Sequence, residues 1–257
     1  RRLIDHVIAG GVHAIFILGS TGEGPALSGR EQRRFIRCCA EAVGGRVPLL
    51  AGISGCSAAE SARLGRFAAD AGADAVVSAV PCYLPPDAEE QVAFYRYLAK
   101  EVPLPLFAYN MPSLTRVSMT LSTVERILEI PGVAGCKDSS GDLDAFRELV
   151  NRFGGRPGIS LLSGPDELTA ETVAMGGDGG VNGGANLRPR LFSGLYEAAA
   201  RGDAAAVGPL QARVVELGKI YGDPVTAPGV IRALKREAAR MGLLRNILAV
   251  PALPEAL

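Results

Sequence analysis

Tryptophan is absent from this chain of 257 residues, and the aromatic residues together make up only 5% of it. Apolar residues nevertheless account for 48%, which is enough for a large core. Such a core must be built mainly from Ala, Val, Leu and Ile. The length suits one large domain or two ordinary ones, and α/β barrels often reach this size as single domains.

Histidine is nearly as scarce, since only His6 and His13 occur, both close to the start. The five cysteines, at positions 38, 39, 56, 82 and 136, form no CxxC pair. A zinc site needs clustered thiolates or imidazoles, so we expect no metal. Neither histidine has a plausible serine or cysteine partner, which disfavours a hydrolase triad. We also expect no other cofactor.

Charge of one sign is not in excess, because 27 basic residues balance 27 acidic ones. This balance offers no electrostatic footprint for nucleic acid, and no basic amphipathic stretch suits a membrane surface. No apolar run approaches the length of a membrane span, and no signal peptide is visible. The odd, irregularly spaced cysteines are typical of reduced thiols, so we expect a cytoplasmic protein.

What the chain does contain is a regular alternation of short apolar runs and helix-like stretches. The runs are rich in Val, Ile and Leu and are continuous rather than alternating, which indicates strands buried on both faces of a parallel sheet. They cover residues 13–20, 47–53, 75–80, 105–110, 133–139, 159–164 and 179–185.

The segments between these runs carry helix start signals. Capping-box spacing occurs at four places, Ser28 with Glu31, Ser57 with Glu60, Asp87 with Glu90, and Ser122 with Glu125. Seven βα units of this kind predict a TIM (β/α)8 barrel in which the first strand is absent from the given residues, and residues 1–10 are the helix that follows it. A doubly wound sheet is the alternative, but no GxGxxG motif follows a strand here.

Two long helical stretches, about 203–222 and 226–243, follow the last run. They predict a C-terminal helical extension. We therefore expect two parts, a barrel over residues 1–202 and a helical region over 203–257 that packs on it.

Lys137 is one of only four lysines in the chain, and it ends the apolar run 133–138. An amine at the end of a buried strand is poorly hydrated, which favours its neutral, nucleophilic form. That form is required for Schiff-base chemistry with a carbonyl substrate. The structural alternative is a lysine that extends toward solvent or pairs with Asp138.

Other reactive side chains also follow strand ends, where a parallel barrel collects its functional residues. Gly19-Ser20-Thr21-Gly22 can form a nest of amides for a carboxylate, although a simple turn is the alternative. Tyr109 can transfer protons, unless it is an ordinary core tyrosine. Tyr83 follows the third run. Glycines 179, 180, 183 and 184 leave room for a ligand, or simply allow close packing.

Five motifs in this order and spacing resemble the dihydrodipicolinate synthase/N-acetylneuraminate lyase family of Schiff-base aldolases. The motifs are Gly19–Glu23, Tyr109–Pro112, Gly135–Asp138, Ser163-Gly164 and Gly176–Asn186. The resemblance covers nearly the whole chain. It implies an eight-stranded barrel with a C-terminal helical region, usually a homotetramer of two tight dimers.

The resemblance also implies roles for residues. Lys137 forms the Schiff base with pyruvate or another 2-oxo acid, and Tyr109 transfers protons. Ser20 and Thr21, with Gly22, bind the substrate carboxylate. Tyr83 is similar to the tyrosine that completes a proton relay through Ser20 in a neighbouring subunit, and the backbone of Val181 contacts the bound oxo acid.

One position departs from the synthase pattern. Synthases typically carry Arg two residues after the proline of the tyrosine motif, where this chain has Leu114. An apolar side chain cannot make that charge-assisted contact with a second carboxylate. Ser20 and Leu114 are closer to the lyase side of the family, whereas Gly183 stands where the lyase has a hydroxyl side chain. Arg116 lies nearby and can restore the contact if it turns inward.

The stretch Gly164-Pro165-Asp166-Glu167 resembles the segment that binds polyol hydroxyls in the lyase. Its carboxylates are suitable acceptors for sugar hydroxyls. Asp166 and Glu167 can equally be the cap and first turn of the next helix.

We therefore expect an enzyme, a class I aldolase or lyase that acts on a hydroxylated, sugar-acid-like 2-oxo acid with pyruvate and an aldehyde as partners. A dihydrodipicolinate synthase that condenses pyruvate with aspartate semialdehyde is the alternative, and a sugar-acid dehydratase belongs to the same class of chemistry. The competing hypothesis from another class is a non-catalytic 2-oxo-acid binder, because fold alone does not establish activity.

Overall fold

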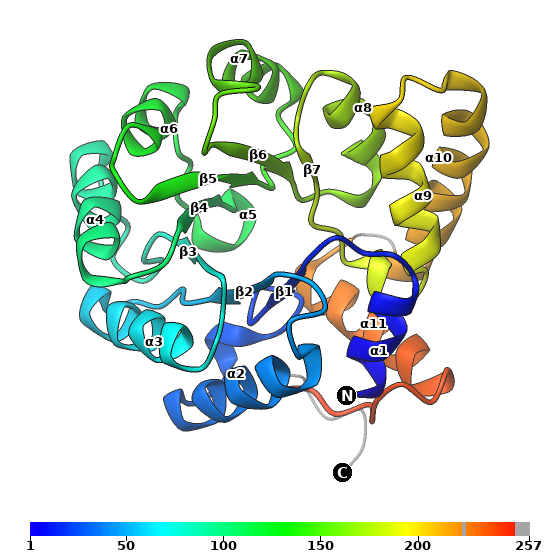
Figure 1. Cartoon of the computed structure of the whole chain (residues 1–257), viewed down its shortest axis with the longest axis horizontal. Helices are drawn as coiled ribbons and strands as arrows, with labels where there is room; N and C mark the ends of the chain where they lie inside the picture. The colour runs from blue at the N-terminus through cyan, green and yellow to red at the C-terminus, as the bar shows by residue number, and fades with distance from the viewer. Residues whose placement is uncertain (223–224, 250–257) are drawn as a thin grey trace.

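The computed structural model describes residues 1–222 and 225–249. The described residues contain one sheet of seven strands in chain order, and every neighbouring pair is parallel. Figure 1 shows the sheet curled into a ring with helices around it, as in a TIM barrel. The strands are β1 (Ile15–Ile17), β2 (Leu49–Gly52), β3 (Ala75–Ala79), β4 (Leu106–Asn110), β5 (Val133–Asp138), β6 (Ser160–Ser163) and β7 (Gly179–Gly180). All seven predicted strands are confirmed.

Helices follow the strands on the outside of the ring. They are α1 (Arg2–Ala9), α2 (Gly29–Val43), α3 (Ala58–Asp70), α4 (Ala88–Glu101), α6 (Leu121–Leu128), α7 (Leu143–Phe153), α8 (Thr169–Ala174) and α9 (Pro189–Ala200). Short 3₁₀ turns are η1 (Gly24–Ala26), η2 (Asp166–Leu168) and η3 (Gly184–Asn186). A further short helix, α5 (Pro112–Thr115), directly follows β4 and lies inside the ring in Figure 1.

Three of the four predicted helix starts are confirmed. Ser28 and Asp87 form complete capping boxes, and the side chain of Ser57 accepts a bond from the Glu60 amide. The fourth was wrong, because α6 begins two residues earlier than Ser122 predicts. Its cap is Thr120, whose hydroxyl accepts a bond from the Thr123 amide and also contacts the Ser122 hydroxyl. Ser122 is a second hydroxyl residue, two positions after the true cap Thr120. It lies three residues before Glu125, which is the spacing of a capping box, and this led to the wrong prediction.

Side chains along each strand point alternately to the outside and the inside of the ring, so the sheet has an apolar core on each side. The larger one fills the space between sheet and helices and includes Cys136, which points outward as predicted. A smaller one lies inside the ring, where Val77, Ala79 and Tyr109 pack with Phe16 and other partly buried side chains. Neighbouring residues of a strand face opposite sides, so Lys137 points inward because Cys136 points outward.

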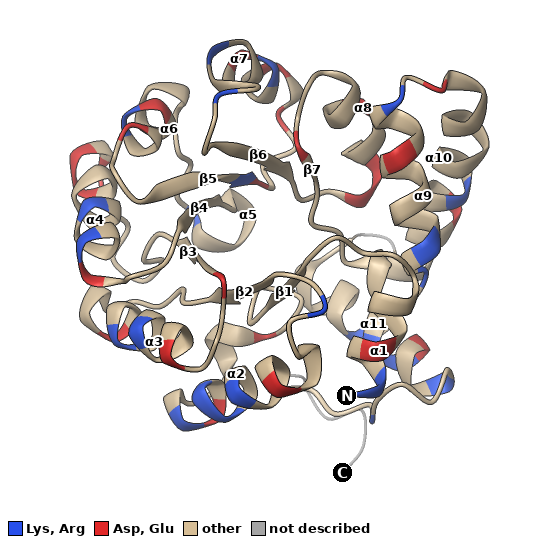
Figure 2. Ribbon diagram, in the orientation of Figure 1, with Lys and Arg blue, Asp and Glu red and all other residues tan. Residues whose placement is uncertain are grey.

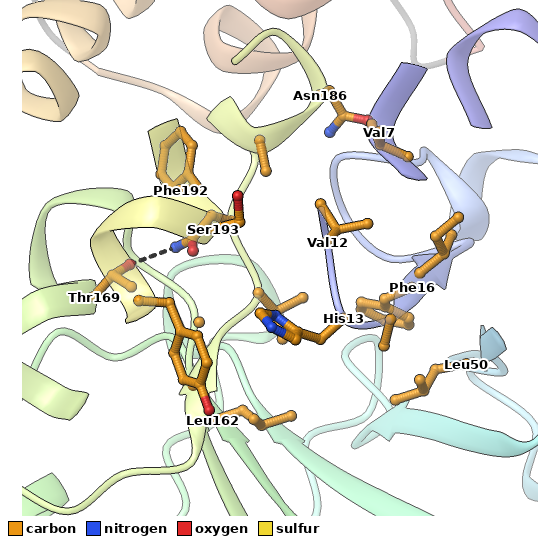
Figure 3. Close-up of a pocket in the computed structure, with 18 of the residues that line it drawn as sticks. Val7, Val12, His13, Phe16, Leu50, Leu162, Thr169, Asn186, Phe192 and Ser193 are labelled. Carbon is orange, nitrogen blue, oxygen red and sulfur yellow. Dashed lines mark hydrogen bonds between the residues drawn. The ribbon is translucent and has the colours of Figure 1, made fainter. Parts of the chain in front are cut away.

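The sheet does not close between β1 and β7. Each of these strands is hydrogen-bonded to one neighbouring strand within the described part of the chain. A mainly apolar cavity of about 270 Å³ lies between them. Figure 3 shows Val12, His13 and Phe16 on one side of it, with Leu162 and Phe192 opposite. An open position next to β1 agrees with a barrel that lacks its first strand.

Two helices, α10 (Ala204–Gly218) and α11 (Ala227–Arg240), joined in part by η4 (Lys219–Tyr221), follow the ring. They correspond to the two predicted C-terminal stretches. α10 packs against α9, and Val214 enters the apolar cluster formed by α8 and α9. α11 packs through Leu234 and Ala238 against Leu187. Among the described helices, none is long and apolar enough to cross a membrane.

A buried polar contact connects this helical region to the ring. The Asp166 carboxylate accepts hydrogen bonds from the Tyr221 hydroxyl (2.8 Å) and from the Gly184 amide (2.9 Å). Burial raises the pKa of Asp166, although both bonds oppose that shift. Burial, together with the negative charge of Asp166, also raises the pKa of Tyr221. The phenol therefore remains a donor to the carboxylate.

We predict that Tyr221→Phe destabilises the protein by about 1–3 kcal/mol, because a buried carboxylate loses a donor. The pKa of Asp166 should rise further, since the bond from Tyr221 is one of the interactions that lower it. The loss should be larger at neutral pH than at acidic pH, where the carboxyl is protonated. Urea unfolding of both proteins at the two pH values measures this difference. An equal loss at both values would contradict the role of the charged carboxylate.

Candidate active site

Lys137 and Tyr109 face each other inside the ring. They occupy paired positions of the neighbouring strands β5 and β4, one residue before each strand ends. The Lys137 Nζ atom lies 4.2 Å from the centre of the Tyr109 ring and 5.2 Å from that of Phe16. Both functional side chains are almost fully buried, with 7% and 4% exposure. Figure 2 shows that other charged residues lie mostly on the outer helices.

The predicted alternative for Lys137, an ion pair with Asp138, does not occur. Asp138 instead accepts a bond from the Asn110 side-chain amide (2.6 Å) and bonds from the amide and hydroxyl of Ser140. Lys137 also forms no ion pair with any other described residue. The amine instead faces the aromatic rings of Tyr109 and Phe16.

Tyr109 is held at both its backbone and its hydroxyl. Its amide donates to the Tyr95 hydroxyl (3.3 Å), which in turn donates to the Ser78 carbonyl (2.7 Å). Its own hydroxyl lies 3.4 Å from Ser20 Oγ. Tyr95 is fully buried, so this anchor fixes the strand that carries the phenol.

The pKa of Tyr109 lies below its ordinary value. Burial acts to raise it, but the nearby charge of Lys137 and interactions with Ser20, Ser139 and Lys137 outweigh burial. A phenol with a lowered pKa gives up its proton more readily, and a protonated amine beside it stabilises the phenolate. Proton transfer between Tyr109 and a group on Lys137 is therefore favoured.

The predicted carboxylate loop follows β1 and folds tightly back on itself. Leu18 and Glu23 both have positive φ (58° and 55°), and a Cβ at Gly24 would lie 2.0 Å from the Leu18 carbonyl oxygen. Only glycine permits that approach. Within the described part of the chain, the amides of Thr21 and Gly22 donate no hydrogen bond, so they can bind a carboxylate.

The C-terminal helical region also contacts this loop. Lys235 of α11 forms an ion pair with the buried carboxylate of Glu23. The amide of Ala249 donates to the same carboxylate at 2.6 Å. These two residues lie more than 200 positions from Glu23 in the sequence, and they fix one end of the loop that begins with Ser20.

Gly164 follows β6, which pairs with β5, and Val181 follows β7, which pairs with β6. A Cβ at Gly164 would lie 1.8 Å from the Ser139 hydroxyl, so this glycine makes room for that hydroxyl. The Val181 amide donates to the Ser163 carbonyl (2.8 Å). Its N–H is thus already used, and the carbonyl is the group left for a ligand.

Asp166 and Glu167 lie in η2, immediately before α8, but neither caps that helix, because its N-cap position is Leu168 and no side chain bonds to its first amides. The Asp166 carboxylate is engaged by Gly184 and Tyr221, while the Glu167 side chain is exposed. A role for either residue in binding sugar hydroxyls remains a prediction.

Leu114 lies on α5 and is 41% exposed, and Tyr83 is 83% exposed on the loop after β3. Neither side chain contacts the Lys137–Tyr109 pair within the described chain. Arg116, at the end of α5, has φ of 60° and is exposed, and it forms no ion pair among the described residues. Its cation therefore remains available at the mouth of the barrel.

Two site residues were missed by sequence reasoning. Ser139 interacts with the Tyr109 phenol, and the signal for it was a hydroxyl residue just past the lysine at a strand end. Phe16 packs close to the Lys137 amine and against the Tyr109 ring, with ring centres 6.4 Å apart. An inward-facing aromatic on β1 carries no sequence signal that separates it from ordinary core.

A buried lysine beside a phenol, at the carboxyl end of a parallel barrel, defines a class I aldolase or lyase site. Comparison with known families supports this assignment. A model of the dihydrodipicolinate synthetase family matches residues 1–256. The chain belongs to this family, whose members are class I aldolase-type enzymes, and the resemblance inferred from the motifs is confirmed.

Individual relatives agree with the family match. The 4-hydroxy-tetrahydrodipicolinate synthase of Azoarcus sp. (strain BH72) is 37% identical over 255 residues, which cover 99% of this chain and 85% of that protein. The dihydrodipicolinate synthase structure from Bacteroides thetaiotaomicron is 42% identical, with a TM-score of 0.91, and the match covers 98% of this chain and 85% of that one. YagE of E. coli K12, solved in complex with pyruvate, is 28% identical with the same TM-score and coverage.

We predict that Tyr109 titrates below Tyr95 and Tyr221, because the Lys137 charge lowers its pKa whereas burial raises theirs. Lys137→Met should raise the pKa of Tyr109, since burial then acts without the opposing charge. A folded-state pKa below the unfolded one means that this phenol adds stability as pH rises through its folded pKa toward the unfolded value.

The pKa of Tyr109 is measured from the ultraviolet absorbance of phenolate during an alkaline titration. The Tyr109→Phe variant shows which part of the absorbance change belongs to Tyr109. An unchanged early titration in Lys137→Met would contradict the assigned cause.

Proposed function

We propose that this protein captures pyruvate as a Schiff base on Lys137 and joins it to an aldehyde. The observation that carries the proposal is the buried amine of Lys137 against the phenol of Tyr109, in a chain of the dihydrodipicolinate synthetase family. The retention of lysine, tyrosine and free loop amides together supports catalysis over simple binding of a 2-oxo acid.

Each group has a step to perform. The neutral Lys137 amine attacks the C2 carbonyl of pyruvate to form a carbinolamine, and Tyr109 donates the proton with which water leaves. The resulting iminium withdraws electrons from C2, so the Tyr109 phenolate left by the previous step can take a methyl proton, which gives an enamine. The enamine carbon attacks the aldehyde and forms the C–C bond, Tyr109 returns its proton to the aldehyde oxygen, and the iminium on Lys137 is restored. Water attacking C2 then releases an open-chain product from Lys137, whereas an amino group on the second substrate attacking C2 displaces Lys137 and closes a ring.

The substrate carboxylate fits the loop after β1. The Thr21 and Gly22 amides lie on the turn that begins with Ser20, and Ser20 Oγ lies 3.4 Å from the Tyr109 hydroxyl. A carboxylate on these amides would place the adjacent carbonyl carbon near the phenol and the amine. We propose Val181 as a backbone contact to the same bound acid.

For the second substrate we propose aspartate semialdehyde, which makes the chain a 4-hydroxy-tetrahydrodipicolinate synthase. The sequence pattern favoured a sugar-acid-like substrate because of Leu114. The comparisons favour the synthase, since relatives 34–39% identical over 91–99% of this chain carry that name. Arg116 supports this choice, because its free cation lies two residues beyond Leu114.

A hydroxylated 2-oxo acid remains the second candidate. The observation that favours it is Leu114 itself, a half-exposed apolar side chain where the synthase pattern has an arginine. Asp166 and Glu167 would then supply acceptors for substrate hydroxyls.

The oligomeric state, the location and the domain division of the protein are also proposals. The 83% exposure of Tyr83 supports a role in a neighbouring subunit, and hence a homotetramer. We propose a cytoplasmic location and a division into residues 1–202 and 203–257. No nucleic acid or membrane partner is proposed.

Borohydride reduction in the presence of pyruvate should add one reduced pyruvate to the protein, on Lys137. Lys137→Ala should abolish the adduct, while Lys100→Ala, at an exposed lysine of α4, should leave it unchanged. Intact mass and peptide mapping locate the label. An unmodified protein, or a label on another lysine, would refute the Schiff-base assignment.

Arg116→Gln should raise the KM for aspartate semialdehyde by roughly tenfold or more, because a charge-assisted contact to its carboxylate is lost. Pyruvate trapping should be unaffected. Arg30→Gln, at an exposed arginine of α2, is the matched control. Steady-state kinetics with pyruvate and aspartate semialdehyde measure the change. Absence of turnover with this aldehyde, together with pyruvate release from hydroxylated 2-oxo acids, would favour the second candidate.

A further inference from the structure

Two exposed cysteines lie side by side at the mouth of the barrel. Cys56 is in the loop after β2, Cys82 is in the loop after β3, and their sulfur atoms are 3.9 Å apart. The three other cysteines are placed differently. Cys39 and Cys136 are buried, and Cys38 lies on the outer helix α2.

The fold keeps this pair together. β2 and β3 are neighbouring parallel strands, so the loops at their carboxyl ends leave the sheet at the same edge. Two hydrogen bonds join the bases of the loops, from the Ile53 amide to the Val77 carbonyl and from the Ala79 amide to Ser54 Oγ, both 2.9 Å. The two thiols therefore remain neighbours through the sheet itself.

The distance between the thiols is suited to a bond. A disulfide needs its sulfur atoms about 2.05 Å apart, so they must approach by roughly 2 Å in total. Side-chain rotation in two loops outside helix and strand can supply such a movement. Cys56 and Cys82 are both exposed in the single chain, so a small reagent can reach their thiols there.

We propose that Cys56 and Cys82 form a reversible disulfide that anchors the loop carrying Tyr83. This modification site does not depend on the proposed enzymatic function. Cys82 immediately precedes Tyr83, and Pro81 and Pro85 already limit the backbone on either side. A covalent bond at Cys82 would hold this segment to the loop before α3.

The oxidant we propose is a small-molecule disulfide such as oxidised glutathione. One protein thiolate attacks a glutathione sulfur and releases one glutathione thiolate. The second protein thiolate then attacks the mixed disulfide, forms the Cys56–Cys82 bond and releases the second glutathione. Two electrons pass from the protein to glutathione, and the two protein protons end on the released glutathione thiols.

The environment of Cys82 makes the reaction dependent on pH. Partial burial, followed by the interaction with the Cys56 thiol, raises the pKa of Cys82. The thiolate is the reactive form, so bond formation should accelerate as pH rises above neutrality.

Incubation of the purified full chain with oxidised glutathione tests the proposal. We expect the protein to lose two hydrogens at this pair, and non-reducing tryptic digestion to join peptides 47–63 and 67–96. Dithiothreitol should reverse the change. Cys56→Ser should abolish the link, and Cys38→Ser should leave it intact. Cys38 serves as an internal comparison, because its thiol should stop at the mixed disulfide.

Hydrogen exchange of residues 80–86 reports the anchoring, and we expect slower exchange after oxidation. Stable glutathione adducts on both Cys56 and Cys82, or links only between separate chains, would overturn the disulfide. A complete internal link with unchanged exchange would overturn the anchoring of the Tyr83 loop.

Discussion

The parallel pairing of β4 with β5 is the constraint on which the site depends. It sets Tyr109 opposite Lys137, and Tyr109 packs inside the ring in an apolar cluster with Val77, Ala79 and Phe16. The faces of Phe16 and Tyr109 surround the Lys137 amine, and Asp138 is bonded to Asn110 and Ser140 instead of to Lys137. The amine is therefore buried but not neutralised by an ion pair.

The C-terminal helical region also contacts loops that lie near the candidate site. Lys235 holds Glu23 at the end of the carboxylate loop, and Tyr221 holds Asp166 beside the end of β6. Both contacts are made to partly or fully buried carboxylates, which need donors to remain where they are. Helices far along the chain thus position two loops at the mouth of the barrel.

We propose that a few side chains at the edge of the site decide the second substrate. Leu114 removes the cation expected in a synthase, while Arg116 offers one at a residue with positive φ. Such a backbone conformation is uncommon for a side-chain-bearing residue and often marks a functional position. Family membership supports the chemistry that we propose on Lys137, and we propose that these exposed residues set the preference for an aldehyde.

The sequence by itself determined the seven strands and three of the four helix starts, and it predicted Lys137 and Tyr109 as candidate site residues at strand ends. Those features follow from local rules, because continuous apolar runs, cap residues and strand ends are each visible within a few positions. Tertiary structure alone decided that Ser139 meets Tyr109, that Cys56 meets Cys82 and that Lys235 meets Glu23. The last two pairs join residues 26 and 212 positions apart, and Ser139 meets Tyr109 across paired strands. Strand order and helix packing bring such residues together. Neither can be predicted from a few neighbouring positions of the sequence.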